Sequence, residues 1–98
     1  MASIPYLLMQ EFHAERERSL GYGKFERMFV FDSAEGMVNN FLHGRTPLEC
    51  LSLTKKAFVS TLNDSKLDFT AEERLAYEDA IEMLDVFALE HGVDPAQL

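Results

Sequence analysis

Three histidines and one cysteine are the side chains of this sequence best suited to bind a metal or attack a substrate. No two of them lie three or four positions apart, the spacing that would place two ligands on one helical face. Cys50 lies in an apolar helical pattern, which is typical of a small buried residue. We therefore predict no metal site, no cofactor and no catalytic residue. The alternative is a small enzyme or a metal- or ligand-binding protein that gathers His13, His43 and Cys50.

Carboxylates are plentiful but unevenly distributed. Residues 63–98 hold ten acids and two bases, whereas residues 1–62 hold seven of each, so the net charge of −8 belongs to the last third of the chain. An exposed row of carboxylates lacks the cleft that would separate the pKa values of a general acid and a general base. Charge of this sign also repels a phosphate backbone, which argues against direct binding of DNA or RNA. A protein with a basic surface is the expected partner.

Capping residues and glycines divide most of the chain into helices that could carry such a surface. Each expected start has a Ser or Thr before the first apolar residue, and two also have Glu three positions later. The expected helices are 4–20, ended by Gly21-Tyr22-Gly23, then 47–62 after Thr46, and 71–91 after Thr70, which is the longest and ends at Gly92.

The stretch between the first two glycines and Thr46 is ambiguous. Residues 25–31 fit either a helix or a short strand, and we favour a helix because no second strand is present to pair with it. Asp32 and Glu35 have the spacing of a capping box, which predicts a separate helix from there to His43. The fold class is therefore all-α, a small bundle of four to five helices, with residues 1–98 forming a single acidic domain.

The composition also bears on the location of the protein. No apolar run approaches the roughly 18 residues needed to span a bilayer, and Pro5 with the acidic and basic residues that follow argues against a signal peptide. A lone cysteine fits a reducing compartment. We expect a cytoplasmic protein without membrane contact.

The outer face of the last helix is the candidate partner-binding surface. On a helical wheel, three apolar residues fall among its carboxylates, where a purely solubilising face would carry polar residues. Apolar side chains supply affinity when desolvated, and carboxylates speed encounter with a basic partner. The predicted partner-binding residues are Leu75, Glu78, Asp79, Glu82, Asp85, Val86 and Leu89.

Two further features indicate contacts between protein molecules. Residues 25–31 hold more apolar surface than one short element usually buries, which predicts a homodimer formed through Phe25, Met28, Phe29 and Phe31. Lys55 interrupts the apolar stripe of the helix that follows Thr46. Either its stem packs while the ammonium group reaches water, or the ammonium pairs with the acidic last helix of a second copy or a partner.

These observations predict a small acidic regulatory or inhibitory protein that binds another protein. A DNA-binding regulator is one such partner, as for an anti-activator, an anti-sigma factor, an immunity protein or a phage inhibitor. The alternatives are the small enzyme or ligand-binding protein described above and a structural subunit of a larger assembly.

Overall fold

The computed structural model describes residues 3–98, and 78% of the chain is helical, which confirms the predicted all-α bundle. Within that range there are four α-helices and no strand. A π-helical turn, η1, extends the second helix, and a short 3-10 helix, η2, closes the chain. The elements are α1 (Ile4–Gly21), α2 (Phe25–Met37), η1 (Val38–Leu42), α3 (Pro47–Leu62), α4 (Ala71–Glu90) and η2 (Pro95–Gln97).

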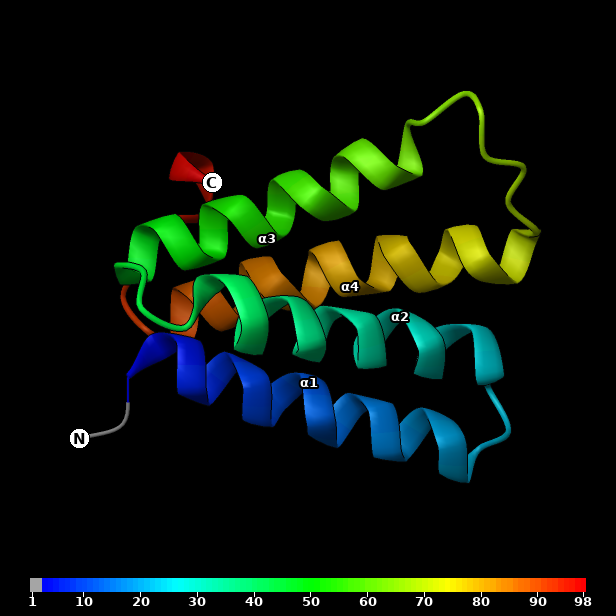
Figure 1. The fold of residues 1–98 in the computed structure, drawn as a ribbon, viewed down its shortest axis with the longest axis horizontal. Helices are drawn as coiled ribbons and strands as arrows, with labels where there is room; N and C mark the ends of the chain where they lie inside the picture. Colours follow the sequence, from blue (N-terminus) through cyan, green and yellow to red (C-terminus); the bar gives the residue numbers. More distant parts are fainter. Residues whose placement is uncertain (1–2) are drawn as a thin grey trace.

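Successive helices run in opposite directions, as Figure 1 shows. α1 packs mainly on α2, and α4 packs on both α2 and α3, while α1 touches α3 over a much smaller area. α2 and α3 diverge from each other across the front of the bundle in Figure 1. None of the helices in residues 3–98 combines the length and apolar character needed to cross a bilayer.

The predicted caps set three of the helix starts. Ser3 accepts a hydrogen bond from the Tyr6 N–H at 3.4 Å, and Thr46 accepts one from the Glu49 N–H at 3.2 Å. Thr70 forms a complete capping box, because its hydroxyl accepts from the Glu73 N–H and the Glu73 carboxylate accepts from the Thr70 N–H. Each cap satisfies a backbone donor that has no partner inside its helix.

The predicted break at Asp32 is wrong. α2 continues through Asp32 to Met37 and passes directly into η1, so residues 25–42 form one rod without a strand or an interruption. Asp32 lies on its exposed side, with Oδ1 3.0 Å from Arg16 Nε of α1. Val30, Ala34 and Val38 are buried and form one row that runs past Asp32 without a break. Burial of this row outweighs the local preference of an aspartate for a helix start.

Glycines end α1 and α4 in the same way. Gly23 and Gly92 have φ of 72° and 77°, in the left-handed region that glycine adopts without a steric penalty. The next N–H in each turn reaches back to a helix carbonyl, from Lys24 to Ser19 and from Val93 to Ala88, at 2.8 Å in both cases. This is the Schellman arrangement, which fixes the direction in which the chain leaves the helix.

All four helices contribute to one core. The Phe12 ring lies 5.9 Å from the Phe31 ring and 6.0 Å from the Phe58 ring, measured between centroids, and so joins α1 to α2 and α3. α4 adds Leu84, which is fully buried. Rings in these tilted and edge-on arrangements stabilise a core beyond the area that they bury.

Candidate partner-binding surface

α4 separates a buried face from an exposed one along its whole length. The buried face consists of Ala76, Ala80, Leu84, Phe87 and Ala88. Three of these are alanines, which let α4 approach α2 and α3 closely. The opposite face is exposed to solvent, and it is the face on which the sequence predicts the partner-binding residues.

The three apolar residues predicted on that face are exposed. The exposed fractions are 57% for Leu75, 49% for Val86 and 65% for Leu89. They lie 11 and 3 positions apart in sequence, a spacing that keeps them on one side of a helix. We call the row formed by Leu75, Glu78, Asp79, Glu82, Asp85, Val86 and Leu89 the α4 stripe.

The carboxylates of the α4 stripe fall into two groups. Asp79 Oδ2 lies 3.6 Å from Arg27 Nε of α2, and Asp85 Oδ1 lies 3.0 Å from Lys55 Nζ of α3. Glu78 and Glu82 are exposed and make no ion pair with any residue between 3 and 98. These two are therefore the acids of the stripe that are free to meet a partner's basic groups.

Lys55 has its counterion within the same chain. Its side chain is largely covered where α3 meets α4, and its ammonium group binds Asp85. The covered stem agrees with both interpretations of the sequence, but the ammonium group neither reaches open water nor needs a second chain, because it pairs with α4 of the same chain. Pairing across an interface is not needed to explain this lysine.

A pocket adjoins the amino-terminal end of the α4 stripe. It has a volume of about 260 Å³ and lies between the start of α2 and the first two turns of α4. Leu75 and Asp79 belong to both the pocket and the stripe. The remaining lining residues are Gly23, Lys24, Glu26, Arg27, Glu72 and Ala76. The exposed face of α4 therefore has a pocket at this end of the stripe, which could enclose a side chain of a partner.

Arg27, which lines this pocket, joins α2 to both α1 and α4. It donates to Ser19 Oγ at 2.7 Å and to Glu15 Oε2 at 2.8 Å on α1, and its guanidinium carbon lies 4.8 Å from the centroid of the Phe31 ring. Burial disfavours the charged form of Glu15, but Arg27 and Arg18 outweigh that effect and hold the pKa of Glu15 below its usual range. The contact to Asp79 extends the network to α4.

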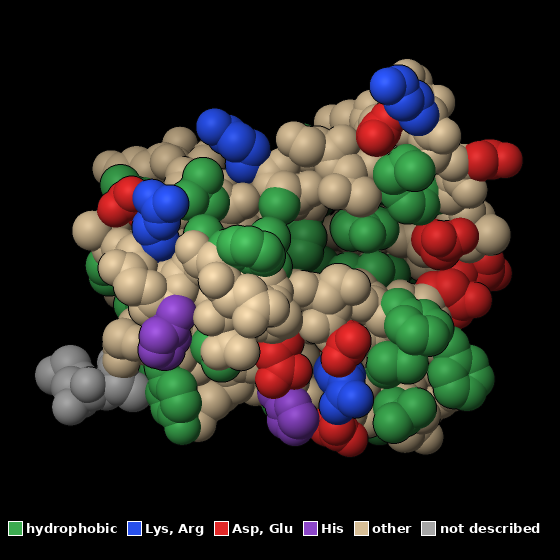
Figure 2. Space-filling view, in the orientation of Figure 1, with side chains coloured by type: hydrophobic (Ala, Val, Ile, Leu, Met, Phe, Trp, Pro, Cys, Tyr) green, Lys and Arg blue, Asp and Glu red, His purple; other side chains and the backbone are tan. Residues whose placement is uncertain are grey.

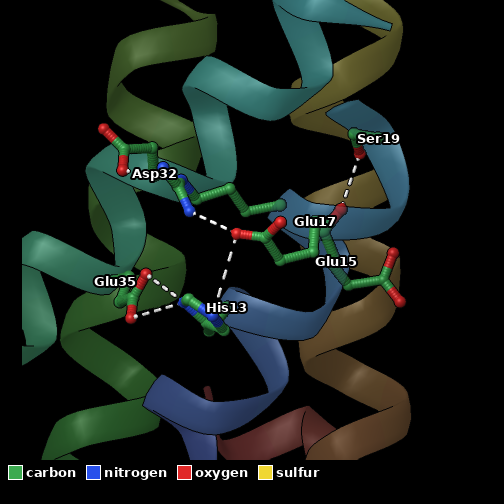
Figure 3. Close-up of polar contacts among 7 residues, drawn as sticks. His13, Glu15, Glu17, Ser19, Asp32 and Glu35 are labelled. Carbon is green, nitrogen blue, oxygen red and sulfur yellow. Dashed lines mark hydrogen bonds and ion pairs between the residues drawn. The ribbon is translucent and has the colours of Figure 1, made fainter. Parts of the chain in front are cut away.

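A second polar network lies on the exposed side of α1 and α2. His13 lies between two carboxylates, with Nδ1 3.2 Å from Glu35 Oε2 and Nε2 3.8 Å from Glu17 Oε1, as Figure 3 shows. Arg16 donates to Glu17 at 2.6 Å and approaches Asp32 through a buried Nε that lacks hydrogen-bond geometry. The groups are exposed or half-exposed, so this network joins two helices without forming an enclosed site.

The other chemically competent side chains do not gather at a common site. No three His, Cys, Asp or Glu side chains of residues 3–98 are placed to share a metal ion. Cys50 is fully buried, and burial raises the pKa of its thiol to about 11. His43 is exposed beyond η1, and the His91 ring lies 4.3 Å from that of Phe87.

The predicted self-association residues separate into two sets. Phe25 and Phe29 are 54% and 63% exposed, whereas Met28 is half-buried. Phe31 is fully buried against Phe12, so its assignment to a self-association surface was wrong. The reason is helical geometry, since Phe31 lies about 160° around α2 from Phe29.

Two exposed residues beside these phenylalanines were missed. Leu20 and Tyr22 are 44% and 78% exposed at the turn between α1 and α2. Leu20 falls one position after Ser19, the residue that continues the buried row of α1. Continuing that row from Leu8 and Phe12 would have placed Leu20 outside the core.

A shallow groove of about 110 Å³ lies between α2 and α3, and apolar side chains are visible in the hollow across the middle of Figure 2. Its floor includes Phe58 and Tyr77, whose rings meet edge to face at 6.3 Å. It is separate from the α4 stripe, because none of its lining residues belongs to the stripe.

Comparisons of the chain with models of known protein families, with curated proteins and with solved structures found no match, so the function is inferred from the surfaces described above.

Proposed function

We propose that this protein is a small regulatory or inhibitory protein that acts by binding another protein through the α4 stripe. The observation that carries the proposal is the exposure of Leu75, Val86 and Leu89 on the same helix face as the unpaired carboxylates of Glu78 and Glu82. An apolar row rimmed by charges of one sign combines affinity with selection of a partner of opposite charge.

The partner in this proposal has a basic surface. Residues 63–98 carry the whole net charge of −8, so the field around α4 attracts cations. A DNA-binding regulator fits this requirement, because the surface that it presents to DNA must be basic. Covering that surface would inhibit it, as an anti-activator or an anti-sigma factor does. The proposal also includes self-association of this chain as a homodimer.

The test compares matched variants in affinity capture from a cell lysate. Leu75→Ala with Val86→Ala removes apolar atoms from the α4 stripe. Phe41→Ala with Leu53→Ala removes exposed apolar atoms from η1 and α3, and serves as the control. We expect the parent chain and the control to retain a small set of basic proteins, and the stripe variant to lose them by about tenfold or more.

Two further measurements sharpen this test. The captured proteins should be released by added salt, because screening weakens attraction between exposed charges. Reversal of Glu78 and Glu82 to Lys should slow association with a purified captured protein, whereas reversal of Asp85 would also break its pair with Lys55. Capture that is equal for the parent and the stripe variant, or that ignores the reversal of both glutamates, would overturn the proposal.

A further inference from the structure

The pocket at the amino-terminal end of the α4 stripe has both apolar and charged walls. It lies where the starts of α2 and α4 come together, at the same end of the bundle in Figure 1. Leu75 and Ala76 give it an apolar side, and five of its eight lining residues are charged. Its volume of about 260 Å³ is below the range of roughly 300–1,000 Å³ typical of pockets for drug-sized molecules. A single side chain of a partner is an occupant of suitable size.

Two of the five charges in the pocket compensate each other. The guanidinium of Arg27 donates to Ser19 and Glu15 on α1, and its Nε lies 3.6 Å from Asp79 Oδ2. All three nitrogens of this group therefore have an oxygen nearby in the same chain. Arg27 is thus engaged within the bundle, and Asp79 has it as a counterion.

The other three charges of the pocket have no counterion. Lys24, Glu26 and Glu72 are exposed, and none of them makes an ion pair with any residue between 3 and 98. Two carboxylates thus face one ammonium group. The adjacent helix α4 also belongs to residues 63–98, which carry the whole net charge of −8. A cation is therefore attracted to this pocket more strongly than an anion.

We infer that the pocket binds an arginine side chain of the partner protein. This inference rests on the proposed function, because Leu75 and Asp79 belong to both the pocket and the α4 stripe. It goes beyond a basic partner surface by naming one residue type on that surface and the place where it binds.

The shape of a guanidinium suits the walls of the pocket. Glu26 lies in the first turn of α2 and Glu72 in the first turn of α4, so the two unpaired carboxylates belong to different helices. A guanidinium carries five N–H donors in one plane and can serve carboxylates on two sides, while its flat face covers the apolar Leu75. A lysine ammonium is more compact and more strongly hydrated, so it loses more on leaving water. Arginine is also among the residues that dominate binding at protein interfaces.

The first test needs no identified partner. A short capped peptide of alanines with one central arginine is titrated into the full, isotope-labelled chain, and the backbone amide signals are followed by NMR. We expect the signals of Gly23, Leu75 and Ala76 to shift, with a dissociation constant in the millimolar range, because only one side chain is bound. The same peptide with citrulline, a neutral side chain of the same shape, should leave these signals unchanged.

Variants of the chain identify the groups that bind the peptide. Glu26→Gln with Glu72→Gln should weaken binding at least about fivefold. Glu11→Gln with Glu90→Gln removes the same charge outside the pocket and the stripe, and should bind within about twofold of the parent. Lys24→Gln should strengthen binding by about twofold, because it removes the unpaired base. Circular dichroism must show the same helix content for all of these chains.

Three results would overturn the inference. They are equal shifts with the citrulline peptide, a pocket variant that binds like the parent, and weaker binding after Lys24→Gln, which would show that the pocket favours an anion. With a purified captured protein, the pocket variant should also bind at least about fivefold more weakly than the Glu11 and Glu90 control. Equal binding by these two chains would overturn the inference as well.

A variant outside the pocket separates this inference from the α4 proposal. Val86→Ala with Leu89→Ala changes the exposed apolar residues of the stripe that do not line the pocket. We expect this variant to lose capture of the partner but to bind the arginine peptide like the parent. If the peptide fails to bind the parent while this variant loses capture, the inference is wrong and the α4 proposal stands. If the variant captures the partner like the parent while the peptide binds, the α4 proposal is wrong and the arginine site remains.

Discussion

Replacing Leu84 by Ala should destabilise the protein far more than the same change at Leu75, on the opposite face of the same helix. Leu84 is fully buried, whereas Leu75 is 57% exposed. Truncation removes three carbon atoms, worth about 0.8 kcal/mol each when fully buried, and a buried site adds the cost of the cavity that remains. The total is about 3–5 kcal/mol for Leu84→Ala and about 1 kcal/mol for Leu75→Ala.

The loss of stability in each variant is measured by urea unfolding, monitored by far-UV circular dichroism. The comparison is valid when the slope of the free energy of unfolding against urea is the same in the variants and the parent. On a thermal scale, each kcal/mol corresponds to about 4–8 °C for a domain of this size, so Leu84→Ala should lower Tm by about 12 °C or more. Equal losses of stability in the two variants would show that the inner and outer faces of α4 are wrongly assigned. The α4 stripe would then be part of the core.

Three further predictions concern the polar and capping residues. Because burial raises the pKa of Cys50 to about 11, alkylation of its thiol near neutral pH should be much slower in the folded protein than in denaturant; similar rates would contradict its burial. The pKa of Glu15 is lowered because its arginine partners outweigh its burial, so its ionised form stabilises the fold above the ordinary carboxyl pKa and this stabilisation is lost as the pH falls through the lower folded-state pKa. Glu15→Gln should therefore reduce stability at neutral pH, with a difference from the parent that shrinks in acid; a difference independent of pH would refute the assignment. Thr70→Ala should cost about 1 kcal/mol in urea unfolding through loss of the capping box, whereas Ser60→Ala, at an exposed position within α3, should change stability by less than about 0.5 kcal/mol.

Local signals in the sequence predicted most of the helix boundaries. The starts of α1, α3 and α4 follow from Ser3, Thr46 and Thr70, since a capping hydroxyl acts within four residues and needs no tertiary contact. The same kind of signal failed at Asp32, because the benefit of a cap there is smaller than that of the buried row running through α2. Whether the capping signal or the buried row determines the local structure depends on how α2 packs against α1 and α4. This packing cannot be read from a single segment of the sequence.

Surfaces were predicted less evenly than helices. Exposure of Leu75, Val86 and Leu89 followed from the helical wheel of α4, because that helix has one clear apolar face. In α2 the apolar residues cover more than one face, so the wheel did not distinguish the buried Phe31 from the exposed Phe29. The links from Arg27 to α1 and α4 join residues up to 52 positions apart in sequence and depend on the assembled bundle.

The order in which the helices pack bears on how the chain reaches this fold. α1 packs on α2 and α3 packs on α4, so each of these contacts joins neighbours in sequence across a short connection. Closing short loops costs little entropy, and helical proteins rich in such local contacts fold in microseconds to milliseconds. We expect a newly synthesised chain to bury Phe12, Phe31, Phe58 and Phe87, four of its eight phenylalanines, within that time. Its apolar segments would then be exposed too briefly for aggregation to compete with folding.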